Sequence, residues 1–173
     1  EAIDEILETA SENRNTWLYS ATMPKSVAKI ASNYMNNPIE ITCGTKNQAA
    51  STVDHGYYLI DHRDRYKVLR RIVDSHPSIY AIVFCRTRAE TQSVAERLQA
   101  DGYNTGGLHG DMSQVQRDGV MKQFKTKNIT ILVATDVASR GIDVDDISHV
   151  IHYQLPDDLE VYTHRSGRTG RAG

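Results

Sequence analysis

The chain has 173 residues, of which 39% are hydrophobic and 24% charged, with a formal net charge of −2 and a pI near 6.4. This composition is ordinary for a globular protein of one domain, or one domain plus a fragment, and no apolar stretch approaches the length of a membrane span, so we expect no membrane partner. The near-neutral charge excludes a protein coated with nucleic acid over its whole surface but is compatible with one cationic groove.

In the first 43 residues we expect a helix, followed by a strand at 16–20, a second helix at 25–34 and a second strand at 39–42. Residues 44–53 are small and polar, which is typical of a linker between domains. The chain begins with Glu rather than Met, and we therefore expect it to be part of something longer.

From residue 54 onward, apolar runs alternate with amphipathic stretches. Strands are expected at 54–60, 79–85, 105–109, 130–135 and 148–153. Helices are expected at 62–75, after Thr87, at 113–125 and from Asp157 to Thr163, and Glu90 lies where it could complete a capping box with Thr87. Strands separated by helices indicate right-handed crossovers and a parallel sheet covered on both faces, which is an α/β fold.

Three segments with unusual residue patterns follow these expected strands. They begin at Arg86, His109 and Thr135. In parallel α/β sheets, ligands bind beyond the carboxyl ends of the strands. The sequence therefore predicts a binding site at that edge of the sheet.

The end of the chain carries three arginines at a spacing of three, Arg165, Arg168 and Arg171, and a glycine precedes each of the last two. Positions i and i+3 share a face of a helical turn, and a guanidinium group can bind two phosphate oxygens at once. The pattern favours phosphate binding, with a solvated basic surface as the alternative.

The two cysteines, Cys43 and Cys85, do not suggest a disulfide framework. Cys85 ends an apolar run and is expected to be a buried thiol. This fits a reducing compartment, and we expect a cytoplasmic protein. His149 and His152 have no Cys or acidic neighbour at a ligand spacing, so no metal is expected to be bound by this chain alone.

Four segments occur in a fixed order: Ser20-Ala21-Thr22, His109-Gly110-Asp111-Met112 with Gln114-x-x-Arg117, Ala134–Asp143, and His164–Arg171. Together they closely resemble motifs of the DEAD-box family of ATP-dependent RNA helicases. The resemblance implies a RecA-like three-layer α/β/α domain with a mostly parallel central sheet at 54–173, truncated at its C-terminus. Residues 1–43 would be the tail of the preceding RecA-like domain, including Ser-Ala-Thr.

The resemblance implies that ATP is bound with Mg²⁺, mainly by the other RecA-like domain. Arg168 and Arg171 would be arginine fingers on the γ-phosphate, and Asp143 would bind the ribose, although an aspartate in a turn is an alternative for Asp143. The sequence contains neither a Gly-x-x-x-x-Gly-Lys-Ser/Thr loop nor Asp-Glu-Ala-Asp. This polypeptide alone is therefore not expected to hydrolyse ATP.

RNA would be held mainly through its phosphates, with little sequence preference. The resemblance assigns phosphate contacts to Thr87, Arg117 and Thr135, and Thr87 could also be a simple helix N-cap. Six residues would couple the domains or the two ligand sites: Ser20, Thr22, Gln114, Arg140, His164 and Arg165. Gln114 would orient Arg117 or the adjoining loop.

The leading hypothesis is the C-terminal half of an RNA helicase whose partners are RNA and the N-terminal RecA-like domain of the same protein. An ATP-gated RNA clamp or partner-recruiting module would carry the same residues, and a DNA translocase is a third possibility that His164 argues against. The strands expected within residues 1–43 would lack their usual neighbours, so self-association through this segment is a further hypothesis.

Overall fold

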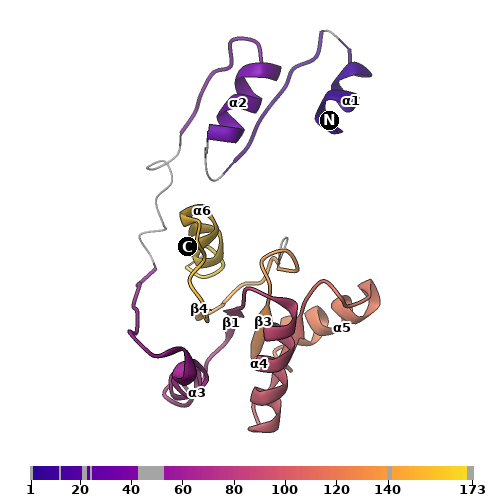
Figure 1. The fold of residues 1–173 in the computed structure, drawn as a ribbon. Coiled ribbons are helices and arrows are strands. Elements are labelled where there is room, and N and C mark those ends of the chain that lie inside the picture. Colours follow the sequence, from indigo (N-terminus) through magenta and orange to yellow (C-terminus); the bar gives the residue numbers. More distant parts are fainter. Residues whose placement is uncertain are drawn as a thin grey trace. The chain divides into compact units, whose positions relative to one another are not determined.

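The computed structural model describes residues 2–11, 13–20, 23, 25–42, 53–139 and 142–170. The chain divides into two compact units, Glu1–Gln48 and Ala49–Gly173. Figure 1 shows the path of the chain through both. Among the described residues, no helix is long and apolar enough to cross a lipid bilayer.

The first unit contains the helices α1 (Ala2–Glu8) and α2 (Lys25–Tyr34). The strands predicted at 16–20 and 39–42 were wrong, because neither segment is paired in a sheet in the described part of the chain. Their apolar side chains are exposed, as Tyr19 and Ile39 illustrate. A strand requires a hydrogen-bonded neighbour, and an apolar pattern cannot supply one.

The second unit is built on a four-stranded parallel sheet in the order β2-β3-β1-β4. The strands are β1 (Ala81–Phe84), β2 (Thr105–Leu108), β3 (Ile131–Ala134) and β4 (His149–His152). Their last residues are in register, so that Leu108, Ala134, Phe84 and His152 lie side by side. All four carboxyl ends therefore meet at one edge of the sheet.

Helices cover both faces of this sheet (Figure 1). The helices of the unit are η1 (His62–Asp64), α3 (Arg65–Asp74), α4 (Arg88–Ala100), α5 (Gln114–Lys125) and α6 (Leu159–Ser166). Alternate residues of β1 enter two separate apolar cores. Ala81 and Val83 pack with side chains of α3 and α4, whereas Ile82 and Phe84 pack with Phe124 of α5. The predicted three-layer α/β/α fold is confirmed.

Helix caps set the start of α4 and α5 beside the carboxyl edge. The Thr87 hydroxyl accepts a hydrogen bond from the Glu90 amide at 3.1 Å, so the predicted N-cap is confirmed. The capping box predicted there was wrong, because the Glu90 carboxylate accepts from the Arg86 amide at 3.4 Å instead. A complete box joins Ser113 and Gln116 at the start of α5.

Two other boundaries differ from the prediction. Residues 54–60 are not a strand, and their side chains Tyr57 and Leu59 are largely exposed. The last helix starts at Leu159 because the Asp158 carboxylate accepts from the Glu160 amide at 2.8 Å, and it continues to Ser166. The helix therefore includes Arg165, and Arg168 follows two residues after its end.

Candidate functional site

The residues that follow the four strands converge at the carboxyl edge of the sheet. Arg86 and Thr87 follow β1, Thr135 and Asp136 follow β3, and Gln154 follows β4. His109 follows β2 at the far side of β3. This is the edge at which the sequence placed the site.

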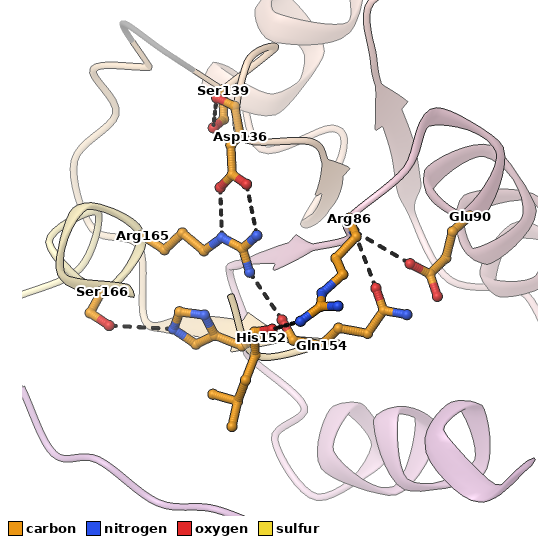
Figure 2. Close-up of polar contacts among 9 residues, drawn as sticks. Arg86, Glu90, Asp136, Ser139, His152, Gln154, Arg165 and Ser166 are labelled. Atoms are coloured by element: carbon orange, nitrogen blue, oxygen red, sulfur yellow. Dashed lines mark hydrogen bonds and ion pairs between the residues drawn. The ribbon is translucent and has the colours of Figure 1, made fainter. Parts of the chain in front are cut away.

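Arg165 is the most buried charged side chain of this edge, with 3% of its surface exposed. Figure 2 shows its guanidinium group facing Asp136. Nε donates to Oδ1 at 2.6 Å, Nη2 donates to Oδ2 at 2.8 Å, and Nη1 donates to the Gln154 carbonyl at 3.1 Å. Such a two-pronged pair fixes both position and orientation, so it joins α6 to the segment after β3.

Gln154 also holds the segment that follows β1. Its side-chain oxygen accepts a hydrogen bond from the Arg86 amide at 3.3 Å (Figure 2). The Arg86 guanidinium donates to the Leu155 carbonyl at 2.7 Å and to Asp157 at 2.6 Å. The ends of β1 and β4 and the start of α6 are thus connected by one polar network.

The predicted nucleotide residues come together next to this network. The Arg168 guanidinium donates to the Ile142 carbonyl at 2.9 Å, and this places it against the backbone that leads to Asp143, whose side chain is exposed. Thr169 donates to the Ile147 carbonyl and holds the same turn. A guanidinium group and a carboxylate on neighbouring backbone segments are compatible with the predicted nucleotide site. The third residue of this prediction, Arg171, lies outside the described residues.

The predicted phosphate-binding residues lie on segments that follow β1, β2 and β3 at the same edge of the sheet. The Arg117 guanidinium donates to the Ala138 carbonyl at 3.2 Å, and the Thr135 carbonyl accepts from the Ser139 amide at 3.0 Å. Arg117 therefore lies against the turn that begins at Thr135. Thr87 follows β1, the strand next to β3, and caps α4, whose N-terminal amides can bind an anion.

The structure describes only some of the residues that are predicted to couple the domains. The Gln114 amide donates to Asp118 at 2.8 Å rather than contacting Arg117. His164 is exposed on α6, with Nε2 3.9 Å from the Glu160 carboxylate. Ser20 is exposed in the first unit, and Thr22 and Arg140 lie outside the described residues. Their coupling roles stay predictions.

The sequence reasoning missed Asp136, Gln154 and His152 as site residues. Burial lowers the pKa of His152 to about 4, with the positive charge of Arg165 as the second cause, so the ring is neutral at neutral pH. Asp136 directly follows Thr135 within a quoted motif, and an acid at that place was a usable signal. Gln154 and His152 carried none, since their importance depends on contacts made in the fold.

Cys85 is buried, as predicted, and burial raises the pKa of its thiol to about 12. A thiol with this pKa is protonated at neutral pH and is a poor nucleophile. Among the described residues, no group of three or more His, Cys, Asp or Glu side chains is placed to hold a metal ion.

Comparison with known proteins assigns the family. The model of the helicase conserved C-terminal domain matches residues 64–173. The DEAD-box ATP-dependent RNA helicase CshA of Geobacillus kaustophilus is 40% identical over 173 residues, which is 100% of this chain and 37% of that protein. The chain belongs to the DEAD-box helicase family.

Solved DEAD-box structures extend this result to the fold. A DEAD box protein from Methanococcus jannaschii is 39% identical with a TM-score of 0.68, covering 98% of this chain and 46% of that one. S. cerevisiae Dbp5 bound to RNA and ADP BeF3 is 26% identical with a TM-score of 0.87, covering 97% and 45%. The fold is therefore that of RecA-like DEAD-box domains, and the chain spans less than half the length of these relatives.

Proposed function

We propose that this chain is the C-terminal half of an ATP-dependent RNA helicase, which binds the RNA backbone and contributes arginines to ATP hydrolysis coupled to local unwinding of RNA duplexes. The observation that carries the proposal is the arrangement of two ligand-binding groups at one sheet edge. Arg117, Thr135 and Thr87 form one group, and Arg168 and Asp143 form the other. The Asp136–Arg165 ion pair joins the segment that contains Thr135 to the helix that precedes Arg168.

ATP supplies the free energy for this reaction, with its triphosphate and Mg²⁺ held mainly by the N-terminal RecA-like domain. This chain would bind the nucleotide from the opposite side. The exposed Asp143 carboxylate is suited to ribose hydroxyls, and Arg168, together with Arg171, would neutralise charge on the γ-phosphate during transfer. Relatives named ATP-dependent RNA helicases support this assignment.

RNA would bind through its phosphates at Thr87, Arg117 and Thr135. Thr87 lies at the start of α4, whose first amides are good partners for phosphate oxygens, and Arg117 lies against the turn that begins at Thr135. Contacts to phosphate carry no base information. A structural neighbour, Dbp5, was solved bound to RNA and ADP BeF3, and this supports RNA as the partner.

The Asp136–Arg165 pair offers a route by which the two ligand groups would influence each other. Asp136 directly follows the RNA-binding Thr135, and Arg165 lies three residues before Arg168. A displacement of the segment after β3 would therefore move α6 and the Arg168 that follows it. Domain closure would add contacts from Ser20, Thr22, Gln114, Arg140 and His164.

The test is ATP hydrolysis by the full-length protein with and without single-stranded RNA, compared with its Arg168→Ala variant. Arginine fingers contribute about 10³–10⁵ to turnover in related nucleotidases, so RNA-stimulated turnover should fall by at least about a thousandfold while ATP binding is nearly kept. Arg63→Ala is the matched control, because Arg63 is an exposed arginine before α3 and outside the site. Lost ATP affinity with preserved turnover would refute the finger role.

Absence of turnover in the unmodified protein under every RNA condition would refute the helicase proposal itself. The remaining alternative would then be a clamp that holds RNA or recruits partners without productive unwinding. RNA affinity measured with and without ATP would identify such a clamp.

A further inference from the structure

Helix α6 carries the arginine network, yet it is poorly anchored by apolar packing. All of its residues are described, and the two that are buried are Arg165 and Ser166. Its first residue, Leu159, is largely exposed. An amphipathic helix normally takes its position from an apolar stripe, so α6 must take its position from other contacts.

A column of rings provides such a contact. The Tyr162 ring of α6 is stacked on the His152 ring at the end of β4, with a centroid distance of 4.7 Å and an interplanar angle of 17°. His152 in turn lies 6.3 Å from the ring of Phe84, which is buried in the core. The column therefore connects α6 to the centre of the sheet.

Hydrogen bonds at both ends fix the angle of these rings. The Tyr162 hydroxyl lies 2.6 Å from Nδ1 of His55, in the segment just after the predicted linker. The His152 Nε2 lies 3.3 Å from the Ser166 hydroxyl, one residue after Arg165 (Figure 2). The column therefore contacts α6 immediately beside the residue that binds Asp136.

We infer that Tyr162 and His152 are positioning residues for ATP hydrolysis, since their ring stack holds α6 where Arg165 meets Asp136 and Arg168 reaches the nucleotide. The inference rests on the proposed function. Neither ring contacts the reacting atoms in this scheme. Because His152 is neutral at neutral pH, its ring stacks on Tyr162 without placing a second positive charge beside Arg165. Displacements of about 1 Å in a catalytic group can reduce turnover by up to about a hundredfold.

The experiment replaces the ring while sparing every proposed ligand-binding residue. In the full-length protein, Tyr162→Leu should lower RNA-stimulated kcat about tenfold and leave KM for ATP and for RNA within about twofold, because orientation is lost and binding is not. Tyr162→Phe keeps the stack and should restore most of kcat. His152→Leu should reproduce the effect of Tyr162→Leu.

Tyr103→Leu is the matched control. Tyr103 is partly buried and donates a hydrogen bond to Asp74 at 2.5 Å, but it lies near the amino ends of the strands, away from the site. The Tyr103→Leu substitution should lower the melting temperature and leave kcat unchanged. If Tyr162→Leu also lowers the melting temperature but leaves kcat within about twofold of the unmodified protein, the positioning role is refuted.

A readout without ATP separates this inference from the proposed function. Amide hydrogen exchange across Leu159–Ser166 should become faster in Tyr162→Leu and stay unchanged in Tyr103→Leu. Unchanged exchange in α6 would overturn the positioning role even if the helicase assignment holds. Faster exchange in a protein that lacks ATPase activity would instead support the ring stack as the anchor of α6 and refute the proposed function.

Discussion

At the scale of single residues, two arginines of one motif have different surroundings in the fold. By spacing alone, Arg165 and Arg168 look equivalent, because they belong to one series of arginines three residues apart. In the fold, Arg165 is buried against a carboxylate, whereas Arg168 is partly exposed beside Asp143. Spacing identified the arginines, but it could not assign a partner such as Asp136, which lies 29 positions from Arg165.

The ion pair between the buried Arg165 and the partly exposed Asp136 leads to a prediction about stability. Arg165→Lys keeps the charge but loses the fork that binds both oxygens of Asp136, so the free energy of unfolding should fall by about 1.5–3 kcal/mol. Urea denaturation followed by circular dichroism measures this change. Arg88→Lys is the control, because the Arg88–Asp111 pair is exposed and such pairs contribute at most about 1 kcal/mol. Equal losses in the two variants would contradict the assigned importance of the Asp136 pair.

At the scale of elements, the sequence predicted buried strands well and exposed strands poorly. The runs around β1 and β3 are apolar at every position because both faces of the sheet are covered, and all eight residues of these strands are buried. Three other segments contain apolar residues but do not pair with a neighbouring strand: 16–20, 39–42 and 54–60. Pairing depends on a neighbour elsewhere in the chain, and local composition carries no information about it.

The capping box of α5 gives an element-scale prediction. Ser113→Ala removes the hydroxyl that accepts from the Gln116 amide, and loss of an N-cap lowers stability by about 1 kcal/mol. The free energy of unfolding should therefore decrease by this amount in chemical denaturation. Ser93→Ala is the matched control, because Ser93 is exposed inside α4 and alanine is the better helix former there. A loss in Ser93→Ala as large as in Ser113→Ala would show that the cap is unimportant.

At the scale of the whole molecule, a net charge of −2 is compatible with RNA binding because a few arginines at one edge of the sheet can contact phosphates. Acidic residues concentrate in the sequence near its start and between Asp143 and Glu160, while arginines recur in the segments that follow the strands. Three of these arginines pair with carboxylates of the same edge, Arg86 with Asp157, Arg88 with Asp111 and Arg165 with Asp136. Composition alone could exclude a uniformly cationic surface. It could not locate the arginines in space, because they meet at one edge only when parallel strands bring four separate segments together.

This arrangement predicts how RNA affinity should respond to salt. Each phosphate neutralised on a single strand contributes about 0.7 to the slope of log affinity against log salt concentration, so Arg117→Ala in the full-length protein should reduce that slope by about 0.7. The loss of affinity should be equal for RNAs of different sequence, since a phosphate contact does not distinguish bases. Fluorescence anisotropy with two unrelated single strands at several salt concentrations measures both quantities, and Arg63→Ala provides the charge-matched control. A loss confined to one RNA sequence would mean that Arg117 reads bases, and the carboxyl edge would then select its RNA rather than simply hold it.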